Sequence, residues 1–193
     1  MAACIALCAT LLALVLPCSA LAHGGSYAVL GGSVADRAEI RAALDASAFD
    51  WSLIPAVIEV HVVPGIAAFS TPGAVWLSPE LLHAGMFSWA VVQDEFAHQV
   101  DFFLLDNTQR AVLNDALGTK VWCHADKSGL PHGGYGCERF TSTFVWAYWP
   151  NRQNAYGPAF GPDREVTMQP WRFRTLMSSL LDPASDGSAY NSP

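Results

Sequence analysis

The stretch VVQDEFAHQVDFFLL, residues 91–105, decides the fold, because it places charged side chains inside a strongly apolar helix pattern. Valine, phenylalanine and leucine occupy most of the circumference, which predicts a largely buried helix over 87–105. Asp94 and His98 are four residues apart, so their side chains project from one face, one turn apart. Burying carboxylates without partners costs several kcal/mol, which a metal ion, a positive partner or a water-filled cleft would relieve.

Short strands are predicted before this helix. The segment AVIEVHVV alternates between two faces, and Pro64-Gly65 and Pro72-Gly73 mark turns, which predicts a small meander of three strands. These strands are expected over 57–62, 66–70 and 74–78. The Gly- and Ser-rich residues 23–33 are expected to form a loose lead-in.

Helices are predicted on both sides of the strands. Ser33 and Ser78 are suitable N-caps, Asn107 or Thr108 can cap a later helix, and Gly118 can end it. The helices besides 87–105 are expected over 34–47, from 78 onward, and over 107–118, 137–149 and 170–182. Loops rich in Gly and Pro are expected over 118–136 and 151–169. The order of helix, strands and then helices predicts an α+β domain with a helical C-terminal half.

The first 22 residues predict a secretory signal peptide. They carry no charged side chain, and an apolar run ends at Ala20-Leu21-Ala22, a pattern typical of a cleavage site. The alternative is a retained membrane anchor, since Ile5 to Ala22 is barely long enough to span a bilayer. The prediction is a secreted protein with one domain over 23–182 and a disordered tail over 183–193.

The cysteines favour export. Three of the five, Cys4, Cys8 and Cys18, lie in the predicted leader, which leaves Cys123 and Cys137 as a pair. A pair in an oxidising compartment predicts one disulfide, worth about 3 kcal/mol for a loop of this length in the chain-entropy model. The alternative is a pair of metal-binding thiolates, although their spacing is unlike CxxC.

The net charge of −7 argues against non-specific binding of nucleic acid, which needs a basic surface. We expect a monomer whose partner or substrate is a peptide or protein, with no membrane association after leader removal.

Two segments together resemble a family of enzymes. DEFAHQVDFF and the later YGCERFTSTFVW resemble the HEFxHxVD and Glu-x-Phe helices of the anthrax lethal factor peptidase family, within the gluzincin metallopeptidases. The similarity covers about residues 54–149 and implies a zincin-like fold, in which the small sheet lies against the buried DExxH helix. The segment HGGYGCERF followed by WAYWP also resembles exported actinobacterial proteins, which implies no activity.

The resemblance assigns roles to individual residues. His98 and Glu138 would be zinc ligands, and Glu95 would be the general base. Tyr135 would donate its phenol to the oxyanion, although it lies closer to Glu138 than in lethal factor. Asp94 stands where the family has its first zinc-binding His.

Two further groups complete the predicted site. Asp101 follows His98 by three residues, and could accept a hydrogen bond from the imidazole and fix its tautomer. His124 or His132, in the loop between the paired cysteines, could replace the missing imidazole; the alternative is that both are exposed loop residues.

The Asp in place of His affects the expected chemistry. A site of Asp94, His98 and Glu138 carries one more negative charge than a His, His and Glu site, which lowers Lewis acidity. The ion could be zinc or a harder divalent ion such as Mn²⁺, or metal binding could be lost.

Three functions follow from these observations. The first is a secreted metallopeptidase that hydrolyses peptide bonds through a metal-activated water. The second is a secreted binding module that keeps the fold and has lost the chemistry, a pseudopeptidase. The third is an unrelated disulfide-containing α+β protein in which DExxH is coincidental.

Overall fold

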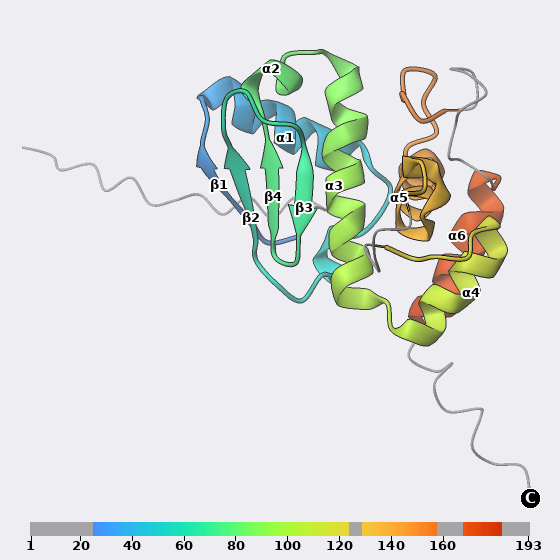
Figure 1. Cartoon of the computed structure of the whole chain (residues 1–193). Helices are drawn as coiled ribbons and strands as arrows, with labels where there is room; N and C mark the ends of the chain where they lie inside the picture. Colours follow the sequence, from blue (N-terminus) through green and yellow to red (C-terminus); the bar gives the residue numbers. More distant parts are fainter. Residues whose placement is uncertain (1–24, 124–128, 158–167, 183–193) are drawn as a thin grey trace, which may run out of the picture.

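The computed structural model describes residues 25–123, 129–157 and 168–182, and shows an α+β architecture (Figure 1). The strands are β1 (Tyr27–Gly31), β2 (Ile58–Val62), β3 (Phe69–Thr71) and β4 (Ala74–Leu77). The α-helices are α1 (Val34–Ala46), α2 (Pro79–Leu82), α3 (Met86–Leu104), α4 (Asn107–Leu117), α5 (Gly136–Tyr148) and α6 (Pro170–Leu181). Two 3₁₀ turns are η1 (Trp51–Leu53) and η2 (His132–Gly134). The predictions for the leader 1–22, the tail 183–193 and His124 lie outside the described residues.

The four strands form a mixed sheet in the order β1-β2-β4-β3. β1 and β2 are parallel, β2 and β4 are parallel, and β3 pairs antiparallel with β4 at the edge. The predicted meander is therefore wrong, because β4 rather than β3 lies beside β2. The segment over 63–68 carries the chain past this position, and the β3–β4 hairpin then folds back toward β2.

The expected loose lead-in over 23–33 is also wrong, because residues 27–31 form β1. Val29 pairs in register with Val60 of β2. Tyr27 and Val29 are partly buried against the core, whereas Ala28 and Leu30 are exposed. A partner 31 residues away in the sequence, rather than the local pattern, makes this segment a strand.

The predicted helices are confirmed to within a few residues, and their caps explain the boundaries. Ser33 caps α1 in a capping box with Asp36, and Ser78 caps α2 with Pro79 at its first position. Gly118 ends α4 in the left-handed conformation. The N-cap of α4 is Asp106 rather than the predicted Asn107 or Thr108.

The helix α3 is the centre of the molecule. It lies between the sheet with α1 on one side and α5 on the other, and α4 and α6 pack beyond α5 (Figure 1). Aromatic side chains fill the space between these layers: Phe96 of α3, Trp51 of η1, and Phe140 and Phe144 of α5 are all at most 2% exposed. This burial fixes α3 and α5 against each other. None of the helices in the described ranges is long and apolar enough to cross a lipid bilayer.

One polar side chain joins α3 to the edge of the sheet. The Gln99 amide donates from Nε2 to the carbonyl oxygens of Thr71 (3.0 Å) and Ala74 (3.2 Å). Its Oε1 accepts from the backbone N–H of Gly73 at 2.9 Å. Gly73 has a φ of 83°, a conformation that favours glycine in this turn. All three polar positions of the buried amide are thereby used to hold the β3–β4 turn.

Candidate metal centre

The middle of α3 carries the charged residues of the candidate site. Asp94 and Glu95 are each 6% exposed, and the side chain of His98 is 11% exposed. Helical geometry places Asp94 and His98 one turn apart on the face that looks toward α5. The apolar residues around them hold the helix in the core, so its polar residues are buried with it.

Glu138, in the first turn of α5, completes the cluster. Its Oε2 lies 3.6 Å from His98 Nε2, and its side chain is 12% exposed. One ligand atom each from Asp94, His98 and Glu138 lie within 4.8 Å of one another. The predicted approach of the carboxylate at 138 to the imidazole at 98 is confirmed. Ligands about 2.0–2.2 Å from a tetrahedral zinc lie roughly 3.3–3.6 Å apart, so modest side-chain rotation would bring these three into reach.

The charges of the cluster shift the pKa of each member. Burial raises the pKa of Asp94 to about 7, against the opposing effect of His98. Burial alone would lower the pKa of His98, but Glu138, Asp94 and Glu95 outweigh it and raise it to about 9. Burial also opposes the charge of Glu138, but its histidine neighbours lower its pKa to about 2. The site therefore holds an ion pair between Glu138 and a protonated His98, beside a carboxyl that gives up its proton reluctantly.

Asp94 supplies the observation that bears most directly on a cation. Its Oδ1 is buried and accepts no hydrogen bond. A buried carboxylate oxygen normally has a donor, and an unpartnered one requires an explanation such as an ion or a proton. The same carboxylate offers a ligand atom to the cluster with His98 and Glu138. The residues present therefore fit a small divalent cation with one nitrogen and two oxygen ligands.

Glu95 is oriented by a residue that the sequence did not single out. The Ser70 hydroxyl of β3 lies 2.7 Å from Glu95 Oε2 and 2.9 Å from the Glu95 backbone oxygen. A hydroxyl has one proton, so Ser70 donates to one of these two Glu95 oxygens at a time. Burial raises the pKa of Glu95, and the hydrogen bond that Ser70 donates to the carboxylate opposes this rise. The only sequence signal was the position of Ser70 in a short predicted strand.

His132 joins the edge of the site. It lies in η2, its side chain is 68% exposed, and its Nε2 is 2.9 Å from Glu138 Oε2. Each imidazole, His98 and His132, thus approaches the same carboxylate oxygen. His132 is not among the residues whose ligand atoms converge with Asp94. It is placed as a partner of Glu138 at the surface rather than as a replacement for the first histidine.

Asp101 bonds to partners other than the predicted one. Its side chain is buried, and its Oδ1 accepts from Arg110 Nε at 2.8 Å. The indole N–H of Trp122 lies 3.0 Å from both carboxylate oxygens. Within the described ranges, no hydrogen bond joins Asp101 to the His98 ring. The carboxylate instead ties α3 to α4 and to the segment that leads to Cys123.

Tyr135 and the other histidines have different positions. Tyr135 is the N-cap residue of α5, three residues before Glu138, and its role toward an oxyanion stays a prediction. His61 lies on the open face of the sheet, where it stacks on Trp76 at 5.0 Å. His83 lies 3.0 Å from Asp36 at the start of α1. Neither His61 nor His83 belongs to the cluster.

The predicted disulfide between Cys123 and Cys137 is confirmed. It joins the segment after α4 to the first turn of α5, next to Glu138. The Cys137 Sγ lies 3.4 Å from Glu138 Oε1. Beneath the bridge, Gly136 allows close packing, because a Cβ there would lie 2.1 Å from Asn114 Oδ1. The covalent bond thereby fixes the start of the helix that carries Glu138.

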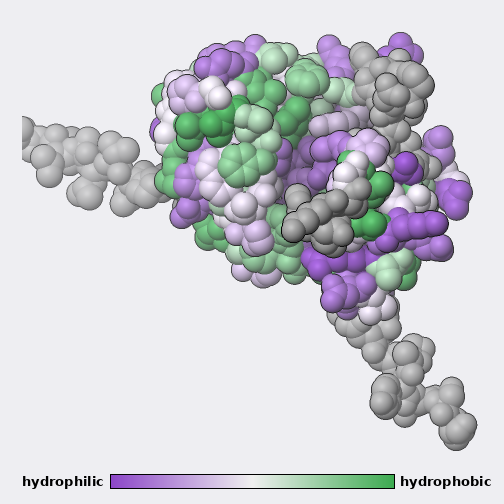
Figure 2. Space-filling model, in the orientation of Figure 1, coloured by the Kyte–Doolittle hydropathy of each residue, from purple (hydrophilic) through white to green (hydrophobic). Residues whose placement is uncertain are grey.

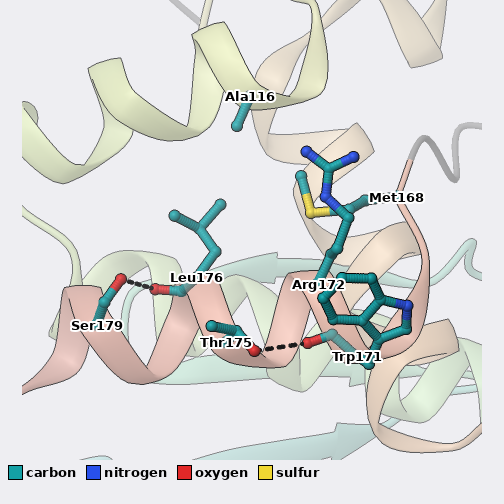
Figure 3. Close-up of a pocket in the computed structure, with 7 residues that line it drawn as sticks. All are labelled: Ala116, Met168, Trp171, Arg172, Thr175, Leu176 and Ser179. Carbon is teal, nitrogen blue, oxygen red and sulfur yellow. Dashed lines mark hydrogen bonds between the residues drawn. The ribbon is translucent and has the colours of Figure 1, made fainter.

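Hydrophilic residues gather in the middle of the face shown in Figure 2, between the sheet side and the helical side. A separate cavity of about 410 Å³ lies between α4 and α6 (Figure 3). Its lining includes Ala116, Trp171 and Leu176, and no residue of the charged cluster.

Comparison of the chain with protein-family models, with curated proteins and with solved structures finds no match.

Proposed function

We propose that this chain is an exported, zincin-like protein that binds a divalent metal ion, preferably zinc, and hydrolyses peptide bonds. The observation that carries the proposal is the convergence of Asp94, His98 and Glu138 from two helices, with a buried Asp94 oxygen that lacks a donor. Two carboxylates and a neutral imidazole would together balance the charge of a divalent ion. The disulfide supports export, because such bonds persist in oxidising compartments.

The chain's own residues can be given roles at this centre. Asp94, His98 and Glu138 would hold the ion, which would supply Lewis acidity toward the scissile carbonyl and lower the pKa of water. Glu95, adjacent on α3, would accept the proton of the attacking water. Its raised pKa would make this carboxylate a stronger base than an exposed glutamate. Tyr135 would stabilise the oxyanion.

The hydrogen bond from Ser70 would keep the Glu95 carboxylate in one orientation. Because Ser70 lies on β3, one of the two edge strands of the sheet, the base is connected to a side of the molecule where an extended peptide could approach. The additional negative charge of Asp94, compared with His, would weaken the Lewis acid, so we expect slow hydrolysis.

A binding module without catalysis is the second candidate, and the burial of the site favours it. Glu95 is 6% exposed, and the Glu138 carboxylate is contacted by His132 from the surface side. A substrate carbonyl would have to displace side chains to reach the base. In this candidate the ion, or a proton in its place, stabilises the contact between α3 and α5 and performs no chemistry.

Metal analysis of the purified full chain tests the proposal. We expect about one equivalent of zinc after dialysis against excess zinc, and its loss in His98→Ala. His61→Ala removes an imidazole outside the site and should retain the metal. A folded protein that binds no divalent ion would contradict the proposed centre.

The variant Asp94→His separates the two candidates. It restores the ligand type found in the resembling family and lowers the negative charge, so we expect tighter zinc binding and increased cleavage of casein. Glu95→Gln in the same background should abolish that cleavage while the metal remains bound. Metal binding without cleavage in Asp94→His would support the binding module.

A further inference from the structure

Glu138 lies between two groups of metal-binding side chains, and each of its oxygens faces one of them. Oε2 approaches the imidazole of His98 at 3.6 Å. Oε1 lies 3.4 Å from the Sγ of Cys137. One ligand atom each from Cys123, Cys137 and Glu138 lie within 4.8 Å of one another, so the sulfur side forms a second cluster around the same carboxylate.

In the oxidised protein, the sulfur atoms of Cys123 and Cys137 are bonded to each other, and neither is a thiolate. Thiolates are the preferred protein ligands of zinc, at about 2.3 Å. Two sulfur atoms on one tetrahedral zinc are therefore roughly 3.8 Å apart. The Cα atoms of the two cysteines are 5.4 Å apart. Rotation about the side-chain bonds can separate the sulfurs by this amount without moving the backbone apart.

We propose that reduction of the Cys123–Cys137 disulfide creates a second metal site, in which two thiolates and Glu138 Oε1 bind a zinc ion. The site is closed in the oxidised protein and open in the reduced protein. The covalent bond that fixes α5 in one state is thus replaced by a metal bridge between the same two segments in the other.

The chemical step balances with a dithiol as the reductant. The dithiol transfers two electrons and two protons to the disulfide and becomes a disulfide itself, which leaves two protein thiols. Zinc then displaces the two thiol protons to solvent and binds the thiolates. No other redox partner is required.

The second site also affects the first. When Glu138 donates electron density to zinc at the sulfur side, its charge is shared and its Oε2 becomes a weaker ligand beside His98. Reduction in the presence of zinc should therefore weaken metal binding at Asp94 and His98. This consequence rests on the proposed function, whereas the thiolate site itself does not.

Cobalt(II) absorption tests the thiolate site directly, because cobalt bound to thiolate gives a charge-transfer band in the near ultraviolet that oxygen and nitrogen ligands do not give. The protein is the full chain with the other cysteines replaced, by Cys4→Ser, Cys8→Ser and Cys18→Ser. It is titrated with cobalt before and after reduction by a phosphine, and far-ultraviolet circular dichroism is recorded for each state.

We expect the band only after reduction, and its loss in Cys123→Ser/Cys137→Ser. Glu138→Gln should weaken cobalt binding at this site about tenfold or more, whereas Glu59→Gln, an exposed carboxylate of β2, should not. Absence of the band in reduced protein, or loss of helical dichroism on reduction, would overturn the proposal. An unchanged affinity in Glu138→Gln would also overturn it. Failure of the oxidised protein to bind zinc would instead overturn the proposed function and leave the cobalt result unaffected.

Discussion

Zinc affinity at the Asp94–His98–Glu138 centre should increase steeply with pH. A metal ligand must be unprotonated, and His98 has a pKa raised to about 9, so only about 1% of it is neutral at pH 7. The affinity at pH 7 is therefore expected to be about 100-fold below its limit, and to rise about tenfold per pH unit toward pH 9. Asp94, with a pKa of about 7, adds a second proton below neutrality.

The assay is competition with a chromophoric zinc chelator, combined with calorimetry in two buffers of different ionisation enthalpy. Binding should release about one proton at pH 8 and about two at pH 6. Measurements in Glu95→Gln remove the neighbouring carboxyl as a further source of protons. His61→Ala should behave like the unmodified chain. An affinity that does not change with pH between about 6.5 and 8.5 would refute a protonated His98 as a ligand.

Three further predictions concern stability and the base. Asp101→Ala leaves the partners of a buried carboxylate unsatisfied and should lower the free energy of unfolding in urea by about 3 kcal/mol, against less than about 0.5 kcal/mol for the exposed Asp115→Ala. Phe144→Ala opens a cavity at a fully buried position and should lower it by about 3–5 kcal/mol, whereas Phe87→Ala, at a residue that is 53% exposed, should have a much smaller effect. Ser70→Ala removes the hydroxyl that lowers the pKa of Glu95, so a carboxyl-carbon NMR titration should place that pKa higher than in the unmodified chain. An unchanged or lower value would contradict the orientation of Glu95 by Ser70.

Helix positions could be predicted because their signals are local. A cap such as Ser33, a proline such as Pro79 and a stop such as Gly118 act within one or two turns of the helix they bound. The period of apolar residues around Asp94 and His98 gave the orientation of both side chains, because helical geometry fixes residues four apart.

The arrangement of the strands could not be predicted in the same way. Parallel pairing joins β1 to β2 across α1, and no local feature of residues 27–31 specifies that partner. For β3 and β4, the spacing of apolar residues is equally compatible with a meander and with the observed order. The two arrangements differ in which strand pairs with β2. In the structure this strand is β4, because its Val75 and Leu77 are buried in the core, and such packing cannot be read from the local sequence.

In the candidate site, too, features set by local helix geometry could be predicted, and features set by packing between elements could not. The sequence indicated Glu138 only through a resemblance, since its approach to His98 depends on how α3 and α5 pack. Asp101 accepts hydrogen bonds from Arg110 of α4 and from Trp122 in the segment after α4. Spacing along α3 could not reveal these two partners, because neither lies on that helix. Asp101 shares a helix face with His98, but its carboxylate bonds to the strong donors that lie nearest to it in space.

The Gln99 amide makes the sheet edge and helix α3, which carries the candidate metal ligands, one mechanical unit. A rotation of α3 that moved the neighbouring His98 would break three hydrogen bonds to the β3–β4 turn, each worth about 1 kcal/mol. The helix therefore cannot adjust to an ion of different size without shifting the edge strand. If the proposed centre binds ions of different radius, the β3–β4 turn should therefore shift, and a changed rate of amide hydrogen exchange at Gly73 would report the shift.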